Sequence, residues 1–245
     1  MAISTVKILG ICASPREGNS KLLLDKALED ISQYPFDTKV AIYSFRNKKI
    51  NPCISCFKCT EKKGRCVQKD DFEELRELWI ASDVIIYSIP VYHLSVPGQL
   101  KCFIDRLGCT FWGYYPVPSV RHLKTIGILA QGEHFFGGQE IAISLLIQHA
   151  VLLNCIPVSG DGWESYIGAA GWTGNILDRD ALAKLCRQDD FETKSTITAA
   201  KSVVKRATEV AAMIKSGCYQ LKHELSSDPR YAPYLARLQE EEFAD

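Results

Sequence analysis

Residues 6–32 read VKILGICASPREGNSKLLLDKALEDIS, and this stretch decides the fold class. The apolar run Val6–Cys12 predicts a buried strand, and the spacing of apolar residues in Lys21–Ser32 predicts an amphipathic helix. A polar loop containing serine, proline and glycine joins the two. A strand that leads directly into a helix is typical of a parallel sheet covered by helices.

The same alternation continues through most of the chain. Further strands are predicted at Val40–Phe45, Val84–Ile89, Thr125–Ala130 and Ile156–Val158. Further helices are predicted at Asp71–Ala81, Gly98–Leu107, Gln139–Leu153 and Thr193–Ser216. The glycine-rich segment Gly162–Gly174 is expected to be a loop. This pattern predicts an α/β fold, with a doubly wound, five-stranded parallel sheet and a C-terminal helical extension.

Composition narrows the class of protein. The chain has 245 residues with 29 basic and 29 acidic side chains, so its formal net charge is +0. This balance gives no reason to expect nucleic acid or a membrane surface as a partner, and no apolar stretch is long enough to span a bilayer. Ten cysteines without a secretory signal predict a reducing, cytoplasmic location. We expect one domain over residues 1–217 and a polar C-terminal arm over residues 218–245.

The loop after the first strand has the composition of a phosphate site. Ser14, Asn19 and Ser20 offer hydroxyl and amide donors, Arg16 adds a positive charge, and Gly18 lets backbone N–H groups approach a ligand closely. The following helix adds the unpaired N–H groups of its first turn. The loop matches neither the Walker motif nor the dinucleotide fingerprint, so ATP and a Rossmann-bound dinucleotide are not the first expectation. The alternative is a polar loop capped by Ser20.

Two motifs carry a resemblance to a known family. Ser14-Pro15-Arg16 followed by Gly18-Asn19-Ser20 resembles the FMN-phosphate loop of the NADPH-dependent FMN reductase group of flavodoxin-like proteins. PVYHLSVPGQLK at residues 90–101, followed by Ile104-Asp105-Arg106, is similar to the loop that runs along the isoalloxazine ring in that group. A third, partial match is Gln131-Gly132-Glu133. The resemblance covers residues 5–160 and implies a flavodoxin-like fold.

The resemblance also implies a set of FMN-binding residues. These are Ser14, Arg16, Gly18, Asn19, Ser20, Pro90, Val91, Tyr92, His93, Ser95, Gln131 and Gly132. Tyr92 and His93 are expected nearest the flavin, although both could instead be turn residues over the core. His134, Phe135 and Phe136 are expected to cover the flavin. No side chain is assigned as a catalytic acid or base, because a flavin carries the redox chemistry itself.

A compact cysteine motif is the second candidate site. Within the loop at residues 50–67 lie Cys53, Cys56, Cys59 and Cys66, spaced Cys-x2-Cys-x2-Cys-x6-Cys. The opening matches that of the bacterial ferredoxin motif, but the fourth cysteine comes after six residues and is followed by Val67 rather than proline. Structural zinc more often uses two separated pairs, and zinc, free thiols and a redox disulfide remain alternatives. The other cysteines are expected to be small core residues: Cys12, Cys102, Cys109, Cys155, Cys186 and Cys218.

An FMN-type loop together with a compact cysteine motif resembles the iron–sulfur flavoprotein family. This resemblance implies FMN, a 4Fe-4S cluster held by the four cysteines of the motif, and a homodimer or tetramer. It implies an oxidoreductase that passes electrons between the cluster and FMN to reduce a small acceptor, such as a quinone, an oxygen species or an electrophilic organic molecule.

The electron donor is left open. NAD(P)H is a candidate, and Lys58, Lys62, Lys63 and Arg65 around the cysteines would suit an acidic donor such as ferredoxin, unless they form an ordinary solvated loop. The alternatives are a cluster-free NAD(P)H-dependent FMN or quinone reductase, and a redox-sensing module without turnover.

Overall fold

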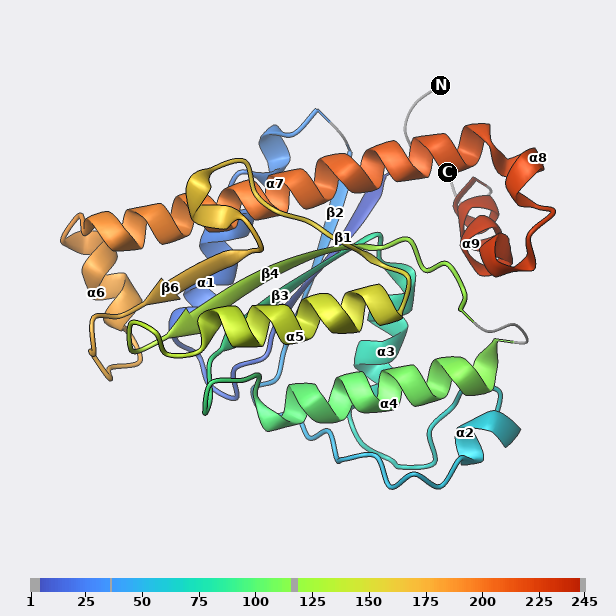
Figure 1. The fold of residues 1–245 in the computed structure, drawn as a ribbon, viewed down its shortest axis with the longest axis horizontal. Helices are drawn as coiled ribbons and strands as arrows, with labels where there is room; N and C mark the ends of the chain where they lie inside the picture. Colours follow the sequence, from blue (N-terminus) through green and yellow to red (C-terminus); the bar gives the residue numbers. More distant parts are fainter. Residues whose placement is uncertain (1–4, 36, 116–118, 243–245) are drawn as a thin grey trace.

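A parallel sheet lies between two layers of helices (Figure 1). The computed structural model describes residues 5–35, 37–115 and 119–242. The main strands are β1 (Val6–Cys12), β2 (Thr38–Ser44), β3 (Val84–Pro90), β4 (Thr125–Gly132) and β5 (Ile156–Pro157). They pair in the order β2-β1-β3-β4-β5, and all of these pairings are parallel. This is the flavodoxin-like order of a doubly wound sheet, so the predicted fold class is confirmed.

A sixth strand, β6 (Ala169–Trp172), lies beyond the expected five. β5 pairs with the start of β4 at Thr125, whereas β6 pairs with its end, from Leu129 to Gly132. The expectation of a loop over Gly162–Gly174 is therefore wrong for these four residues. Their sequence, AAGW, has no strand pattern of its own, and the edge of β4 left open by the short β5 provides the pairing.

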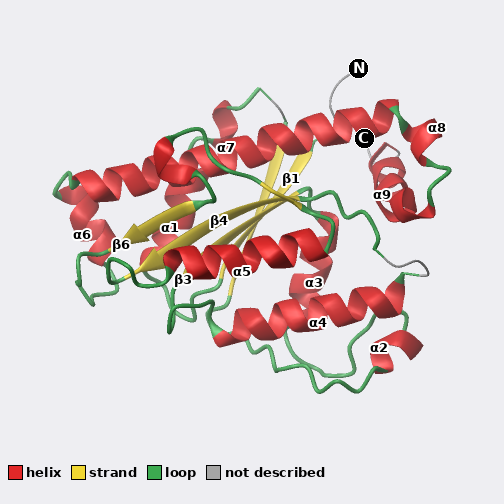
Figure 2. Cartoon of the chain, viewed as in Figure 1, coloured by secondary structure: helices red, strands yellow, loops and turns green. Residues whose placement is uncertain are grey.

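The helices divide between the two faces of the sheet (Figure 2). Cores of buried apolar side chains show that α1 (Asn19–Leu28) and α7 (Phe191–Gln220) cover one face. The other face is covered by α3 (Phe72–Ala81), α4 (Gly98–Tyr114) and α5 (Gln139–Leu152). Successive residues of β1 serve both cores, because Ile8 packs toward α1 and α7 while Leu9 packs on the opposite side. Burial on both faces explains the continuous apolar runs of the sequence.

The shorter helices lie around this sandwich. They are α2 (Lys58–Glu61), α6 (Ala181–Arg187), α8 (Lys222–Leu225) and α9 (Ala232–Glu242). The C-terminal arm consists of short helices joined by turns, and Tyr234, Leu235 and Leu238 of α9 are buried with Cys218. Arg237 of α9 lies 2.7 Å from the carboxylate of the buried Asp83, which directly precedes β3. The arm thus docks at the edge where the strands begin. None of the helices in residues 5–35, 37–115 and 119–242 combines the length and the apolar character that a bilayer-spanning helix needs.

Candidate functional site

The loops that follow β1, β3 and β4 meet at the carboxyl edge of the sheet and line a cavity of about 560 Å³. The sequence-predicted cofactor residues that line it are Ser14, Arg16, Gly18, Asn19, Ser20, Pro90, Val91, Tyr92, His93, Gln131 and Gly132. Ser95 does not line the cavity. Its backbone N–H donates to the Tyr92 carbonyl at 3.0 Å, and the Tyr92 N–H donates back to the Ser95 carbonyl at 2.9 Å. Ser95 therefore shapes the loop that presents Tyr92.

The first loop is held in shape by its own polar groups. The Ser14 hydroxyl donates to the Arg16 carbonyl at 2.8 Å. The Asn19 amide is used for packing, since it donates to the Asp178 carbonyl at 3.3 Å and accepts from the Leu182 N–H at 3.0 Å. It therefore binds the start of α6 and the segment before it rather than pointing a free amide into the cavity. No side chain caps the start of α1 at Gly18, so the first-turn N–H groups are left for a ligand.

Arg179 is a cavity residue that no sequence motif marks. It lies in the segment between β6 and α6 and lines the cavity together with Arg16. An alanine-like Cβ at Gly18 would lie 3.1 Å from the Arg179 carbonyl oxygen, so the two segments are in close contact. Both arginine side chains are exposed, and both stand beside the uncapped start of α1. Their positive charges favour an anionic group at this end of the cavity.

The second and third loops fit together tightly. His93 and Leu94 adopt left-handed backbone angles, with φ of 47° and 61°, which is costly for residues with side chains. Gly138, with φ of 97°, lies so close that a Cβ there would be 2.3 Å from the Leu94 Cα. Only glycine fits at this position. The contact fixes the two loops relative to each other across the cavity.

The third loop supplies a covering segment and one buried acceptor. Phe136 is 88% exposed and lines the cavity with His134, whose Nδ1 is 2.6 Å from the Asn175 Oδ1. Phe135 packs on Trp172 instead, with ring centroids 4.9 Å apart. Gln131 is only 4% exposed, and its Oε1 has no hydrogen-bond partner among the described residues. The Gln131 Nε2 donates to the Gly132 carbonyl at 3.0 Å, so the side chain of this cavity-lining residue keeps one open acceptor among the described residues.

The cysteine loop forms a second, smaller cavity of about 80 Å³. All four cysteines of the motif line it: Cys53, Cys56, Cys59 and Cys66. No three His, Cys, Asp or Glu side chains in the described part of the chain are arranged to hold a single metal ion. The thiols thus surround a space rather than converge on one point.

A fifth thiol, from α4, lines the same cavity. Cys109 was expected in the core, and this expectation is wrong: it is half-buried, and its carbonyl accepts from the Cys59 thiol at 3.3 Å. Burial raises the pKa of the Cys109 thiol to about 11, and the neighbouring Cys53 contributes to this shift. The sequence carried no signal for this contact, because Cys109 lies on a different element from the motif.

Glycines let the cysteine loop lie directly on α4. A Cβ at Gly113 would be 2.6 Å from the Cys59 carbonyl carbon. Gly64 has φ of 78°, and a Cβ there would lie 2.4 Å from the Cβ of Tyr114. Both positions therefore require glycine. The backbone of α2, which carries Cys59, consequently approaches α4 more closely than side chains would allow.

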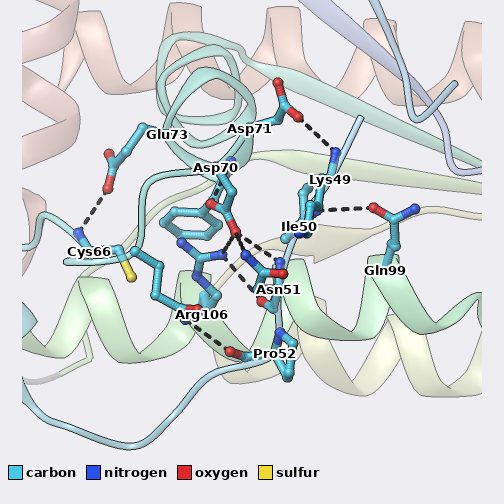
Figure 3. Close-up of polar contacts among 12 residues, drawn as sticks. Lys49, Ile50, Asn51, Pro52, Cys66, Asp70, Asp71, Glu73, Gln99 and Arg106 are labelled. Carbon is cyan, nitrogen blue, oxygen red and sulfur yellow. Dashed lines mark hydrogen bonds and ion pairs between the residues drawn. The ribbon is translucent and has the colours of Figure 1, made fainter. Parts of the chain in front are cut away.

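A buried ion pair closes the base of the cysteine loop (Figure 3). Arg106 of α4 is 1% exposed, and its Nη1 donates to the Asp70 Oδ2 at 2.6 Å and to the Asn51 carbonyl at 3.2 Å. The Asp70 Oδ2 also accepts from the backbone N–H of Asn51 at 2.8 Å. Asn51 precedes the first cysteine and Asp70 follows the last, so one carboxylate ties both ends of the loop to α4 (Figure 3).

The same pair sets the local electrostatics. Burial alone would raise the pKa of Asp70, but the Arg106 guanidinium and the Asn51 N–H lower it below its usual range. The Nε and Nη2 atoms of Arg106 are buried and have no hydrogen-bond partner within the described ranges. They belong to the side chain that lines the cysteine cavity. Lys101 and Asp105 form a separate ion pair on the exposed surface of α4, at 2.5 Å.

Comparison with known proteins gives a consistent result. The chain matches the NADPH-dependent FMN reductase family over residues 6–165. An iron–sulfur flavoprotein of Methanosarcina thermophila is 38% identical over 178 residues, which cover 72% of this chain and 87% of that protein. An iron–sulfur flavoprotein of Archaeoglobus fulgidus is 34% identical over 171 residues, which cover 70% of this chain and 85% of that protein. The crystal structure of RosB with a bound riboflavin-phosphate intermediate is similar in fold, with a TM-score of 0.58 and 14% identity over 91% of this chain and 89% of that one.

Proposed function

Because the chain belongs to the NADPH-dependent FMN reductase family, and within it to the iron–sulfur flavoproteins, we propose that this oxidoreductase holds FMN in the larger cavity and a 4Fe-4S cluster in the smaller one. The proposed reaction passes electrons between the two groups and reduces a small acceptor: a quinone, an oxygen species or an electrophilic organic molecule. The observation that carries the proposal is the presence of both cavities in one chain, each lined by the residue types that its group requires.

The larger cavity suits FMN at both of its ends. Arg16, Arg179 and the uncapped start of α1 form a cationic, N–H-rich end for the phosphate. At the other end, the unpartnered Gln131 Oε1 would accept from an N–H of the flavin ring, and Tyr92 would offer a flat surface. The exposed Phe136 would shield the ring from water. In this arrangement the protein binds and orients the cofactor.

The smaller cavity suits a thiolate-held cluster. Its four motif cysteines are soft donors, which iron–sulfur clusters require. The unpartnered N–H groups of Arg106 complement the negative charge that four thiolates bring. When both groups are bound, FMN supplies two-electron chemistry and the cluster supplies one-electron transfer.

A second copy of the chain fits this proposal. The larger cavity lies before the start of α4, whereas the smaller one lies at Arg106–Trp112. At about 1.5 Å per residue, roughly 12 Å or more of helix therefore separates the two cavities. Ile54, Phe57 and Trp112 line the smaller cavity and are each more than half exposed. Large apolar side chains gathered in this way are typical of interfaces. We therefore propose a homodimer or tetramer in which one subunit covers the cysteine loop of another.

The proposed donors are NAD(P)H and an acidic electron carrier such as ferredoxin. The four cations of the cysteine segment, Lys58, Lys62, Lys63 and Arg65, are all exposed. They would attract an acidic protein toward the smaller cavity, most strongly at low salt.

The test is anaerobic purification followed by measurement of FMN, iron and labile sulfide per chain. We expect about one FMN, four irons and four sulfides, together with steady-state turnover from NAD(P)H or reduced ferredoxin to an added quinone. FMN without iron would replace the proposal with a cluster-free FMN or quinone reductase. A fully loaded protein with no turnover would point to a redox sensor.

A further inference from the structure

Arg106 has one edge of its guanidinium in use and one edge open. Nη1 is bonded to Asp70 and Asn51, whereas Nε and Nη2 are buried without a partner among the residues that the structure describes. A buried N–H group without an acceptor is destabilising, and folded proteins rarely leave two on one side chain. Nε–H and one N–H of Nη2 point in parallel from the same edge of the planar group, so they form a ready-made fork for an acceptor.

The open edge belongs to the cysteine cavity. Arg106 lines this cavity together with Cys66 and Cys59. Figure 3 shows the Cys66 sulfur on the side of the guanidinium away from Asp70. Cys66 is itself fixed through its backbone, because its N–H donates to the Glu73 Oε1 at 2.8 Å. The Cys66 backbone and the guanidinium fork are therefore both held in place before any metal group binds.

We propose that Arg106 is a positioning residue of the iron–sulfur centre, whose Nε–H and Nη2–H fork donates hydrogen bonds to the sulfur of Cys66 and to the sulfide edge of the cluster beside it. The inference rests on the proposed function, since it needs a cluster on the four motif cysteines. It goes beyond that function by assigning the residue that sets the potential of the cluster.

The physical effect follows from charge. Four thiolates leave a cluster negatively charged, and accepting one electron increases that negative charge. Hydrogen bonds to sulfur and a nearby buried cation both favour the reduced state, so they raise the reduction potential. Asp70 neutralises part of the Arg106 charge, but its Oδ2 oxygen also accepts from the Asn51 N–H. The hydrogen bonds from Arg106 to sulfur act whatever the net charge of the Arg106–Asp70 pair. Arg106 thus makes the cluster easier to reduce.

The experiment measures the cluster's midpoint potential in an anaerobic redox titration followed by electron paramagnetic resonance. In R106Q we expect the ratio of reduced to oxidised cluster at a fixed potential to fall at least about tenfold, which corresponds to a shift of about 59 mV for one electron. R106K keeps the charge but loses the fork, so its shift should be smaller. The matched control is R65Q, which removes an exposed arginine next to Cys66 and should change the ratio less than twofold, because solvent screens its charge.

A second variant separates the electrostatic role from a structural one. R106Q leaves a buried Asp70 carboxylate without its cation, which destabilises the fold. D70N/R106Q replaces both partners with neutral amides, so it should fold even if R106Q fails to fold. Any of the three Arg106 variants that retains full iron and sulfide at the wild-type potential would show a merely structural role and overturn the inference. A wild-type protein that contains no iron would instead overturn the proposed function. Lowered potentials in the order R106Q below R106K below wild type support the inference.

Discussion

At the scale of single residues, each of the two sites combines residues that are close in the sequence with residues that come from distant elements. Ser14, Arg16 and Gly18 are close in the chain and therefore come together around the larger cavity. Cys53 to Cys66 meet for the same reason. Arg179 and Cys109 join these groups from distant elements, and no local pattern marked either of them. Asn19 lines the larger cavity as expected, but its side-chain amide also bonds to the Asp178 carbonyl and the Leu182 N–H, a contact that the sequence did not indicate.

The four motif cysteines and the fifth thiol are distinguished by substitution. We expect C66S to lose most of its iron and sulfide, because a serine oxygen is a poor ligand for an iron–sulfur cluster. C109S should keep both in full, since Cys109 lies outside the proposed ligand set. The measurement is iron and sulfide per chain after anaerobic purification, with FMN content as the control for folding. Iron retained in C66S and lost in C109S would reassign the fourth ligand to Cys109.

Arg179 should contribute to the binding of the phosphate of FMN and not of the flavin ring. A hydrogen bond to a charged group contributes about 1.5–3 kcal/mol, so R179A should weaken FMN binding by at least about tenfold. Riboflavin, which lacks the phosphate, should bind R179A and the wild-type chain equally well. R187A, which removes an exposed arginine of α6 outside the cavity, is the matched control. Equal losses for both ligands would contradict this role.

At the scale of elements, α4 follows the loop that lines the larger cavity and contributes side chains to the smaller one. Its first turn ties to the chain beyond β2, because the Gln99 Oε1 accepts from the Ile50 N–H at 3.0 Å. The sequence predicted its end at Leu107, but the structure extends it to Tyr114, through Gly108 and Gly113, two residues that weaken a helix. Phe111 packs against Trp79 with centroids 5.4 Å apart, and this tertiary contact outweighs the glycines. The added turns carry Cys109 and the contact with α2.

The ion pair between Arg106 of α4 and Asp70, which follows the cysteine loop, predicts that the stability of the protein depends on pH. The pKa of Asp70 is lower in the folded protein than its usual 3.8, so its contribution is fully present above that value and is lost as pH falls through the folded pKa. D70N should cost about 3–5 kcal/mol at pH 7, because it leaves the buried Arg106 unpaired. The difference from wild type should shrink below about pH 4. Denaturant unfolding between pH 3 and 7 measures it, with the exposed D178N as the control. A constant difference across this range would refute the argument.

At the scale of the whole molecule, the two edges of the sheet have different tasks. Figure 1 shows α9 and the far end of α7 at one end of the sheet and the loops after β3, β4 and β6 at the other. Asp83 anchors the first edge, with the Lys215 Nζ at 3.1 Å and Arg237 at 2.7 Å. We propose that the arm beyond residue 217 is a stabilising attachment rather than part of either site.

Removal of residues 222–245 tests this proposal. The truncated chain should lose about 2–5 kcal/mol of unfolding free energy, because it lacks Tyr234, Leu235 and Leu238, which form a small apolar core with Cys218. FMN affinity should be unchanged, since the larger cavity lies at the opposite edge of the sheet. Thermal unfolding and FMN titration measure the two quantities. A loss of FMN affinity without a loss of stability would place the arm in the site.

The sequence by itself determined the order of strands and helices, the flavodoxin-like class, the loops at the carboxyl edge and the four-cysteine segment. These features depend on residues a few positions apart, where periodicity and short motifs report local structure directly. Only the tertiary structure decided the position of β6, the docking of the arm, the extra turns of α4, and the arrival of Arg179, Arg106 and Cys109 at the two cavities. Each of these depends on contacts between elements far apart in the chain, and no local pattern encodes which distant surface a residue will meet.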